Sequence, residues 1–393
     1  MAKRSSENDS FRLYDRLYRI CKRIVCPAIC RFLRFHGEPL PKADGPALIM
    51  CNHNTDLDFL LLISAYPGIM DFVATENVAR MGLFGSFAAK HLHPILHDKG
   101  SVGLGTVRSI VSRIKAGRSV LLFPEGNRSF DGLTCPVPKA TGGLARVTGC
   151  TLILYKLTGG YLTSPRWGKG FRKGRMEGHV AGIFTPEDLM AMTSEEVQTE
   201  IEKALQTDAY EEQAESPVQF RSRHGAEFLE SVLFMCPACG RTNTLHSHAN
   251  VLSCIECGHK MTYMPYGCLL SPDGSESTVT GLLREQEKQL AGMIGMSSSP
   301  LFSDTLTCRR IGTSHDILDC KEVSLTAYAD RLCLGDEVLP ASLISSVTIV
   351  QRNRLSIHPK NSKEHYELLG PDTFNALKYR LWKELTTAGD MVY

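Results

Sequence analysis

The sequence predicts an α/β domain with a mostly parallel sheet and flanking helices, followed by a metal-binding ribbon and a small β-rich domain with a C-terminal helix. Three observations support this architecture. Between residues 47 and 157, short apolar runs alternate with stretches of helical periodicity, a pattern typical of parallel α/β sheets. Two Cys-x-x-Cys pairs follow. Beyond residue 306 the apolar residues alternate in short runs before a last stretch of helical spacing.

The composition is that of a globular protein of moderate charge. The chain has 393 residues, 43% of them hydrophobic and 22% charged, with a formal net charge of +2. This length predicts two or three domains, and the near-zero charge argues against a nucleic-acid binder that works by bulk charge. Residues 1–10 lack the apolar core of a signal peptide, and no apolar run reaches the roughly 20 residues needed to span a bilayer. We therefore expect a cytoplasmic protein with reduced cysteines.

Residues 1–40 are predicted to form basic amphipathic helices. Residues 11–35 carry seven Lys or Arg against one acid, a local charge of +6, and arginines recur on the face opposite the apolar stripe. The stripe comprises Phe11, Tyr14, Leu17, Tyr18, Cys21, Ile24 and Val25. Two interpretations stay open: a helix peripheral to the inner face of a membrane, lying in the lipid interface, and a core-packing helix whose solvated face is basic. Pro27 is expected to kink or end this helix.

The α/β domain is expected to occupy residues 41–215. Continuous apolar runs at 47–51, 119–123 and 151–155 suit buried strands. An apolar stripe that closes on Gly117 predicts a helix between the first two. In such sheets the chemistry lies at the carboxyl ends of the strands.

A histidine and an aspartate follow the first strand. His53 comes directly after Asn52, and Asp58 stands five residues later, on the opening turn of an apolar helix. A carboxylate in this place can orient the imidazole, which leaves the far nitrogen free to take a proton from a hydroxyl. On spacing alone Asp56 is an equal candidate, and a helix cap with a surface pair is the more common outcome of such spacing.

A second constellation follows the 119–123 strand and comprises Phe123-Pro124-Glu125-Gly126-Asn127-Arg128-Ser129. Arg128 offers a planar fork for a phosphate or a carboxylate. Glu125 can accept from a substrate hydroxyl or hold the arginine. Both constellations are expected at the same edge of the sheet.

These segments resemble two sequence blocks of the glycerolipid acyltransferases typified by 1-acylglycerol-3-phosphate (lysophosphatidate) acyltransferase. Asn52, His53 and Asp58 match the first block, and residues 123–129 match the third, with Asn127 in place of threonine. The resemblance covers about residues 40–210, with the two blocks about seventy residues apart.

The resemblance implies the roles of the site residues. His53 is the expected general base, and Asp58 rather than Asp56 orients it. Glu125, Gly126 and Arg128 are expected to bind the phosphoglycerol end of the acceptor.

Two lysines are further candidates for the acceptor site. The family's second block usually leads to an arginine that grips phosphate, whereas Lys99 stands in the corresponding stretch here and lacks bidentate geometry. Lys139 belongs to a loose match of the fourth block. These departures leave the identity of the acceptor open.

The resemblance further implies direct acyl transfer, without a covalent enzyme intermediate or a catalytic cofactor. The donor is acyl-CoA or acyl-carrier protein, and the acceptor is 1-acyl-glycerol-3-phosphate, so the product is phosphatidate. Two alternatives are an acyltransferase for another acceptor, such as glycerol-3-phosphate or another lysophospholipid, and a catalytically silent lipid- or protein-binding scaffold. The intact set of histidine, aspartate, glutamate and arginine favours the enzyme.

The two cysteine pairs predict a structural zinc site. Fourteen residues separate the pairs, each of which ends in a glycine, and the four cysteines are Cys236, Cys239, Cys254 and Cys257. Four thiolates close a tetrahedral site with no position for water; a rubredoxin-like iron site and two disulfides are the less favoured alternatives. We place this zinc ribbon at residues 218–270. Arg241 is the only Lys or Arg between the outer cysteines, so no nucleic-acid partner is expected.

The remaining segments are predicted from pattern alone. Residues 301–393 are expected to form a β-meander with a C-terminal helix, weakly similar to a pleckstrin-homology domain. Residues 292–300, rich in Gly, Ser and Met, are expected to be a loop. The basic, glycine-spaced stretch 165–175 fits either an interfacial or acyl-carrier contact or a solvated hairpin.

Overall fold

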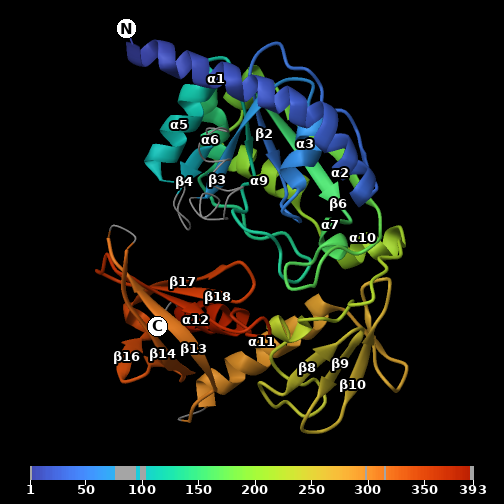
Figure 1. Ribbon diagram of the computed structural model, residues 1–393, viewed down its shortest axis with the longest axis vertical. Helices are drawn as coiled ribbons and strands as arrows, with labels where there is room; N and C mark the ends of the chain where they lie inside the picture. The colour runs from blue at the N-terminus through green and yellow to red at the C-terminus, as the bar shows by residue number, and fades with distance from the viewer. Residues whose placement is uncertain (1, 76–93, 98–102, 297–298, 314–315, 390–393) are drawn as a thin grey trace. The chain divides into compact units, whose positions relative to one another are not determined.

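The computed structural model describes residues 2–75, 94–97, 103–296, 299–313 and 316–389 (Figure 1). The chain forms two compact units. The first comprises residues 1–165 and 173–220, and the second comprises residues 166–172 and 221–393. The finer division expected above, at 1–40, 41–215, 218–270 and 301–393, stays a prediction.

A seven-stranded sheet forms the centre of the first unit, in the order β1-β7-β6-β2-β5-β3-β4. Its strands are β1 (Phe35–Gly37), β2 (Ala47–Cys51), β3 (Met70–Thr75), β4 (Ile95–His97), β5 (Ser119–Leu122), β6 (Thr151–Thr158) and β7 (Met176–Phe184). Neighbouring strands from β6 to β4 pair in parallel, whereas β6 and β7 pair antiparallel. The predicted α/β class with a mostly parallel sheet is confirmed.

Helices cover both faces of this sheet (Figure 1). The helices described in this unit are α1 (Ala2–Ile20), α2 (Cys26–Leu33), α3 (Asp58–Ala65), α5 (Leu104–Lys115), α6 (Thr141–Thr148), α7 (Gly160–Thr163), α8 (Pro186–Ala191), α9 (Ser194–Leu205) and α10 (Ala209–Glu215); of these, α7 and α10 pack in a separate cluster. Successive side chains of a strand point to opposite faces. Ile49 of β2 therefore packs in a cluster with Tyr14 of α1 and Leu61 of α3, whereas Leu48 packs with residues of α5, α6 and α9.

The N-terminal helical segment is not regular α-helix throughout. A π-helical segment, Cys21–Val25, joins α1 to α2, so the helical path continues through Pro27, which lies in the first turn of α2 where a missing N–H is tolerated. The wider π turn shifts the angular position of every later residue. Of the apolar stripe, Tyr14 and Tyr18 are buried, whereas Ile24 and Val25 are exposed.

The second unit begins with a five-stranded antiparallel sheet, in the order β12-β11-β10-β9-β8. Its strands are β8 (Leu245–His248), β9 (Val251–Cys254), β10 (Lys260–Tyr263), β11 (Leu269–Leu270) and β12 (Glu276–Ser277). Helix α11 (Val279–Met296) follows. Residues 292–296, which were expected to be a loop, belong to this helix, so that part of the prediction was wrong. A buried stripe that includes Leu283 and Leu290 stabilises the helix into its last turns.

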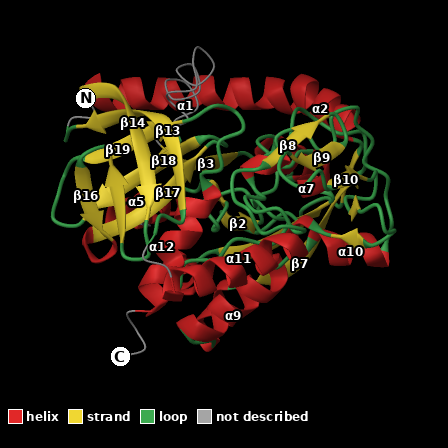
Figure 2. Ribbon diagram, turned by 90° about the horizontal axis from the view of Figure 1, so that it is seen from below, coloured by secondary structure: helices red, strands yellow, loops and turns green. Residues whose placement is uncertain are grey.

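A second seven-stranded sheet lies in the C-terminal region, and its strands are antiparallel (Figure 2). The strands are β13 (Phe302–Ile311), β14 (Ile317–Ala327), β15 (Arg331–Leu334), β16 (Glu337–Pro340), β17 (Ile344–Val350), β18 (Arg354–Pro359) and β19 (His365–Leu369). Helix α12 (Leu377–Gly389) closes the chain and buries Leu377 and Trp382. The predicted β-rich region that ends in a helix is confirmed, and its likeness to a pleckstrin-homology domain stays a prediction.

Residues 166–172 pack within the second unit. Trp167 and Arg172 are buried, and the Arg172 guanidinium lies 4.9 Å from the ring centroid of Trp167 and 4.5 Å from that of Tyr263. Arg172 also donates to the Tyr263 hydroxyl at 2.7 Å and to the Gly225 carbonyl at 2.6 Å. A solvated hairpin was therefore the wrong expectation for these two side chains.

Candidate functional site

His53 and Asp58 form a hydrogen-bonded pair at the carboxyl end of β2. The His53 Nδ1 lies 3.0 Å from the Asp58 Oδ2. The same oxygen accepts from the amides of Asn54 at 2.6 Å and Thr55 at 2.8 Å. A carboxylate is an acceptor only, so Nδ1 carries the proton and Nε2 is the free basic nitrogen of the neutral ring.

The imidazole is fixed in orientation but open to substrate. Its ring stacks on that of Phe123, with centroids 4.4 Å apart and an interplanar angle of 20°. The side chain of His53 is 24% exposed, whereas that of Asp58 is fully buried. Within the part of the chain that the structure describes, Nε2 has no hydrogen-bond partner. The geometry is therefore that of a general base with an accessible nitrogen.

Glu125 binds main-chain amides. Its Oε1 accepts from the His53 amide at 2.9 Å, and its Oε2 accepts from the Cys135 amide at 2.7 Å. Burial raises the pKa of Glu125 to about 8; the Asp58 charge also raises it, while the two amide hydrogen bonds lower it. The carboxylate joins the segment after β5 to the turn after β2, strands that are neighbours in the sheet.

Arg128 also holds the turn that carries His53. Its Nε donates to the Asn54 carbonyl at 2.9 Å, its Nη1 to Asp56 Oδ2 at 2.7 Å, and its Nη2 to the Ser164 carbonyl at 2.5 Å. Asp56 is thus the partner of Arg128, and Asp58 is the partner of His53. The Asp56 side chain is 69% exposed.

Two residues of this site had no role assigned from the sequence. Asn52 is buried and exchanges two hydrogen bonds with the main chain of Leu157 in β6, at 2.8 and 2.7 Å. Cys135 supplies an amide to Glu125. The position of Asn52 next to His53 was a signal in the sequence for its role. Cys135 contributes only a main-chain amide, which leaves no signal in the sequence.

The other predicted acceptor residues have different surroundings. Gly126 has a φ of +64° and its amide donates to the Phe123 carbonyl at 3.1 Å, so it closes a tight turn. Lys139 is exposed just before α6. Lys99 lies outside the described residues. The acceptor-binding roles predicted for these three residues, and for Glu125 and Arg128, stay predictions.

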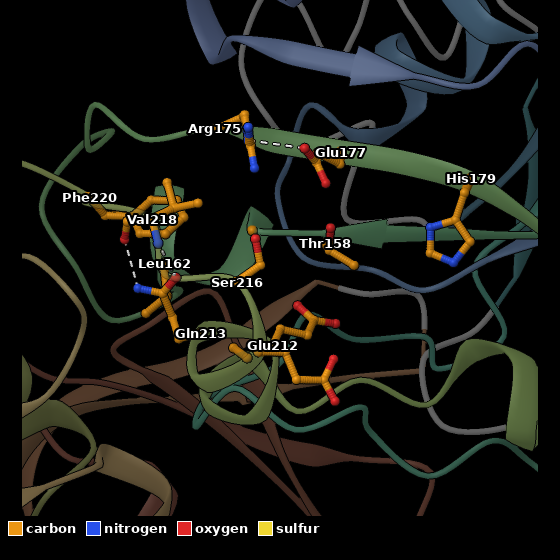
Figure 3. A pocket seen from close by; sticks show the side chains of 13 residues that line it. Thr158, Leu162, Arg175, Glu177, His179, Glu212, Gln213, Ser216, Val218 and Phe220 are labelled. Atoms are coloured by element: carbon orange, nitrogen blue, oxygen red, sulfur yellow. Dashed lines mark hydrogen bonds and ion pairs between the residues drawn. The ribbon is translucent and has the colours of Figure 1, made fainter.

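A cavity of about 200 Å³ lies at the end of β6 (Figure 3). Thr158 and Gly159 line it, directly after the residue that binds Asn52. Its Arg175 pairs with Glu177 at 3.0 Å, and its Glu212 lies 3.9 Å from Lys156. Burial raises the pKa of Glu212 to about 7. Since these charges pair with one another, we assign no ligand to the cavity.

The four predicted cysteines come together in the second unit. Their sulfurs lie within 4.8 Å of one another, with 3.7 Å between those of Cys236 and Cys257 and 3.8 Å between those of Cys239 and Cys254. A tetrahedron with Zn–S bonds of about 2.3 Å has edges of about 3.8 Å. The observed spacing therefore fits a zinc ion.

Each cysteine pair forms a tight knuckle. Gly240 and Gly258 have φ values of +70° and +74°. Their amides donate to the carbonyls of Cys236 and Cys254 at 2.9 and 3.1 Å. A positive φ is accessible to glycine at little cost, which explains the glycine after each pair.

Comparison with known proteins shows that part of the first unit is similar to acyltransferases. Residues 32–154 match the family model described as Acyltransferase. A relative from Brassica napus, the chloroplastic 1-acyl-sn-glycerol-3-phosphate acyltransferase BAT2, is 29% identical over 31% of this chain and 36% of its own length. The 1-acyl-sn-glycerol-3-phosphate acyltransferase of Bacillus subtilis is 25% identical over 44% of this chain and 82% of its own length.

A solved structure also aligns with part of the chain. The PlsC 1-acyl-sn-glycerophosphate acyltransferase of Thermotoga maritima aligns with 50% of this chain and 82% of its own, at 20% identity and a TM-score of 0.41. The chain spans only about a third of the length of the two chloroplastic relatives from Brassica napus and Arabidopsis thaliana, 36% and 34% respectively. The family resemblance predicted from the sequence is confirmed. No helix among the described residues combines the length and the hydrophobicity needed to cross a bilayer.

Proposed function

We propose that this chain transfers a fatty acyl group from acyl-CoA or acyl-carrier protein to the free hydroxyl of 1-acyl-glycerol-3-phosphate. The observation that carries the proposal is the His53–Asp58 pair at 3.0 Å, with a partly exposed imidazole. The acyltransferase match over residues 32–154 includes both residues.

The proposed reaction is a direct transfer. Nε2 of His53 takes the proton of the acceptor hydroxyl as that oxygen attacks the thioester carbonyl. Asp58 stabilises the imidazolium that forms. The tetrahedral intermediate then breaks its C–S bond, and the imidazolium returns the proton to the departing thiolate. The ester and the free thiol are the products, and no cofactor takes part.

The phosphate of the acceptor is proposed to bind beside the His53 turn. Arg128 is held by two carbonyl oxygens and by Asp56, and only the Asp56 carboxylate is largely exposed. Exposed ion pairs contribute little free energy, so a phosphate can replace Asp56 at Nη1. Lys139, exposed before α6, and Lys99 are the further cationic candidates.

The four cysteines are proposed to hold a structural zinc ion. The ion would fix the two knuckles of the ribbon in the second unit. No position is left for water on a metal with four thiolate ligands, so this zinc has no part in acyl transfer.

The N-terminal helices are proposed to rest on the inner face of a membrane. Leu13, Ile20, Ile24 and Phe32 expose 43%, 48%, 67% and 60% of their surface, among exposed arginines. Such a surface suits an anionic lipid interface. Phe32→Glu should reduce sedimentation with anionic vesicles, whereas Val338→Glu, an exposed apolar residue of β16, should not. Equal sedimentation of both variants contradicts this proposal.

The test of the activity is a transfer assay with labelled acyl-CoA and acyl-carrier protein on a panel of acceptors. We expect 1-acyl-glycerol-3-phosphate to be acylated faster than glycerol-3-phosphate or other lysophospholipids. His53→Ala should lower the rate at least about 100-fold, and His36→Ala, an exposed histidine outside the site, should leave it unchanged. A fully active His53→Ala variant, or a wild-type chain inactive with both donors, contradicts the proposal.

A further inference from the structure

The amides of the His53 turn are held by side chains. Three consecutive amides, those of His53, Asn54 and Thr55, donate to carboxylates at 2.9, 2.6 and 2.8 Å. The carbonyl of Asn54 accepts from Arg128. The turn that presents the imidazole therefore takes its shape from Glu125, Asp58 and Arg128.

Glu125 occupies a special place in this arrangement. Asp58 is local, because it lies five residues from His53, whereas Glu125 comes from the segment after β5. Its two oxygens bind two different segments, through the amides of His53 and Cys135. The carboxylate thus fixes the starting point of the turn relative to the sheet.

The burial of Glu125 leaves little room for a substrate. The residue is 7% exposed, and each oxygen already accepts from an amide with good distance. Because so little of the residue is exposed, an acceptor hydroxyl could reach the carboxyl group only by moving the segments that cover it, which would pull away the amide of His53 or of Cys135. Leaving a buried donor unpaired is strongly unfavourable.

We propose that Glu125 is a positioning residue, which sets the main chain at His53 through the two oxygens of its carboxyl group and does not touch the acceptor. This inference rests on the proposed function, and it revises the acceptor-binding role expected for Glu125 from the family resemblance. Its mechanism is geometric: a displacement of about 1 Å in a reacting group costs up to about 100-fold in rate.

The test is Glu125→Gln, which keeps the size of the side chain. The amide oxygen of glutamine accepts from one N–H, but its NH₂ group cannot accept from the other. We expect kcat to fall about 10- to 100-fold and KM for 1-acyl-glycerol-3-phosphate to stay within about twofold. A rise in KM with unchanged kcat indicates direct acceptor contact and overturns the proposal. Glu187→Gln, an exposed glutamate of α8, is the matched control and should change neither constant.

A readout independent of activity separates this inference from the proposed function. In full-length protein with isotope-labelled histidine, the NMR shifts of the His53 ring should move in Glu125→Gln and stay unchanged in Glu187→Gln. If the wild-type chain transfers no acyl group, that movement still supports positioning by Glu125. Unmoved His53 shifts in a folded variant overturn the inference even when the enzyme is active.

A measurement on the wild-type chain covers the case in which the variant does not fold. The amides of His53 and Cys135 should be protected from hydrogen exchange, and the protection should persist when 1-acyl-glycerol-3-phosphate is added. Rapid exchange of either amide, or loss of its protection on addition of the acceptor, contradicts the role assigned to Glu125.

Discussion

The Oδ2 atom of Asp58 lies 3.0 Å from the Nδ1 atom of His53 and also accepts the amides of Asn54 and Thr55. Its Oδ1 accepts from the Thr55 hydroxyl at 2.7 Å. One buried carboxylate therefore selects the ring tautomer and shapes the turn that carries the ring. The two tasks cannot be separated by position, because the same oxygen performs both.

Asp58→Asn should consequently lose most of the activity. The amide oxygen of asparagine can still accept from Nδ1 when its NH₂ group faces the Thr55 hydroxyl, but it carries no negative charge to stabilise the imidazolium. We expect kcat to fall by about 100-fold or more in the transfer assay. Asp56→Asn serves as the control, since Asp56 contacts Arg128 and not the ring; we expect an effect of a few-fold at most. Comparable losses in the two variants, with circular dichroism showing both folded, contradict the assignment of Asp58.

The zinc assignment predicts about one zinc ion per chain in freshly purified protein. Cys236→Ser should lower the metal content well below one and lower the midpoint of thermal unfolding of the second unit by about 10 °C, because binding of a structural metal stabilises the folded state. Cys320→Ser, an exposed cysteine of β14, should change neither. Metal analysis by mass spectrometry measures the first quantity. A wild-type chain that holds iron, or far less than one zinc, contradicts the assignment.

The local parts of the site were predictable from the sequence, since they depend on short spacings. His53 and Asp58 are five residues apart, and the two residues of each cysteine pair are three apart. A strand end or a tight turn fixes such geometry. The role of Glu125 depends on β2 and β5 being neighbours, although β3 and β4 lie between them in the chain. Periodicity identifies strands but gives no strand order, so the contact between Glu125 and the His53 amide could not be predicted.

The errors in the predicted fold also concern features that the apolar pattern of the sequence does not reveal. The π segment at Cys21–Val25 leaves no signature in an apolar stripe, yet it turns Ile24 and Val25 outward. Helix α11 runs through Gly292 because packing of its earlier turns outweighs the weak helix propensity of glycine. Arg172 was placed in a basic loop, and its burial depends on the rings of Trp167 and Tyr263 and on hydrogen bonds to the Tyr263 hydroxyl and the Gly225 carbonyl.

The raised pKa of Glu125 predicts a pH dependence of stability. Burial raises this pKa from 4.5 to about 8, so between these values the folded state binds more protons than the unfolded state. Stability contributed by the protonated carboxyl is complete below the unfolded value and is lost as the pH rises through the folded value. As the pH rises from 5 to 8, the thermal midpoint of the wild type should therefore fall relative to that of Glu125→Gln. A difference that stays constant, or shifts the other way, contradicts the raised pKa.

The close approach of α6 to α9 predicts that Gly142 is required for the packing of the first unit. A Cβ at Gly142 would lie 2.2 Å from the Ser194 carbonyl oxygen and 2.6 Å from the Gln198 nitrogen, both main-chain atoms that cannot rotate away. Gly142→Ala should thus lower the free energy of unfolding by about 1–3 kcal/mol. Gly143→Ala is the matched control in the next position, where the nearest atom is the Ser194 hydroxyl at 3.7 Å, an ordinary van der Waals contact. Because alanine is the better helix former, we expect this control to be unchanged or up to about 1 kcal/mol more stable. Denaturant titration of both variants measures the contrast, and equal stabilities would show that the two helices pack less closely than the structure indicates.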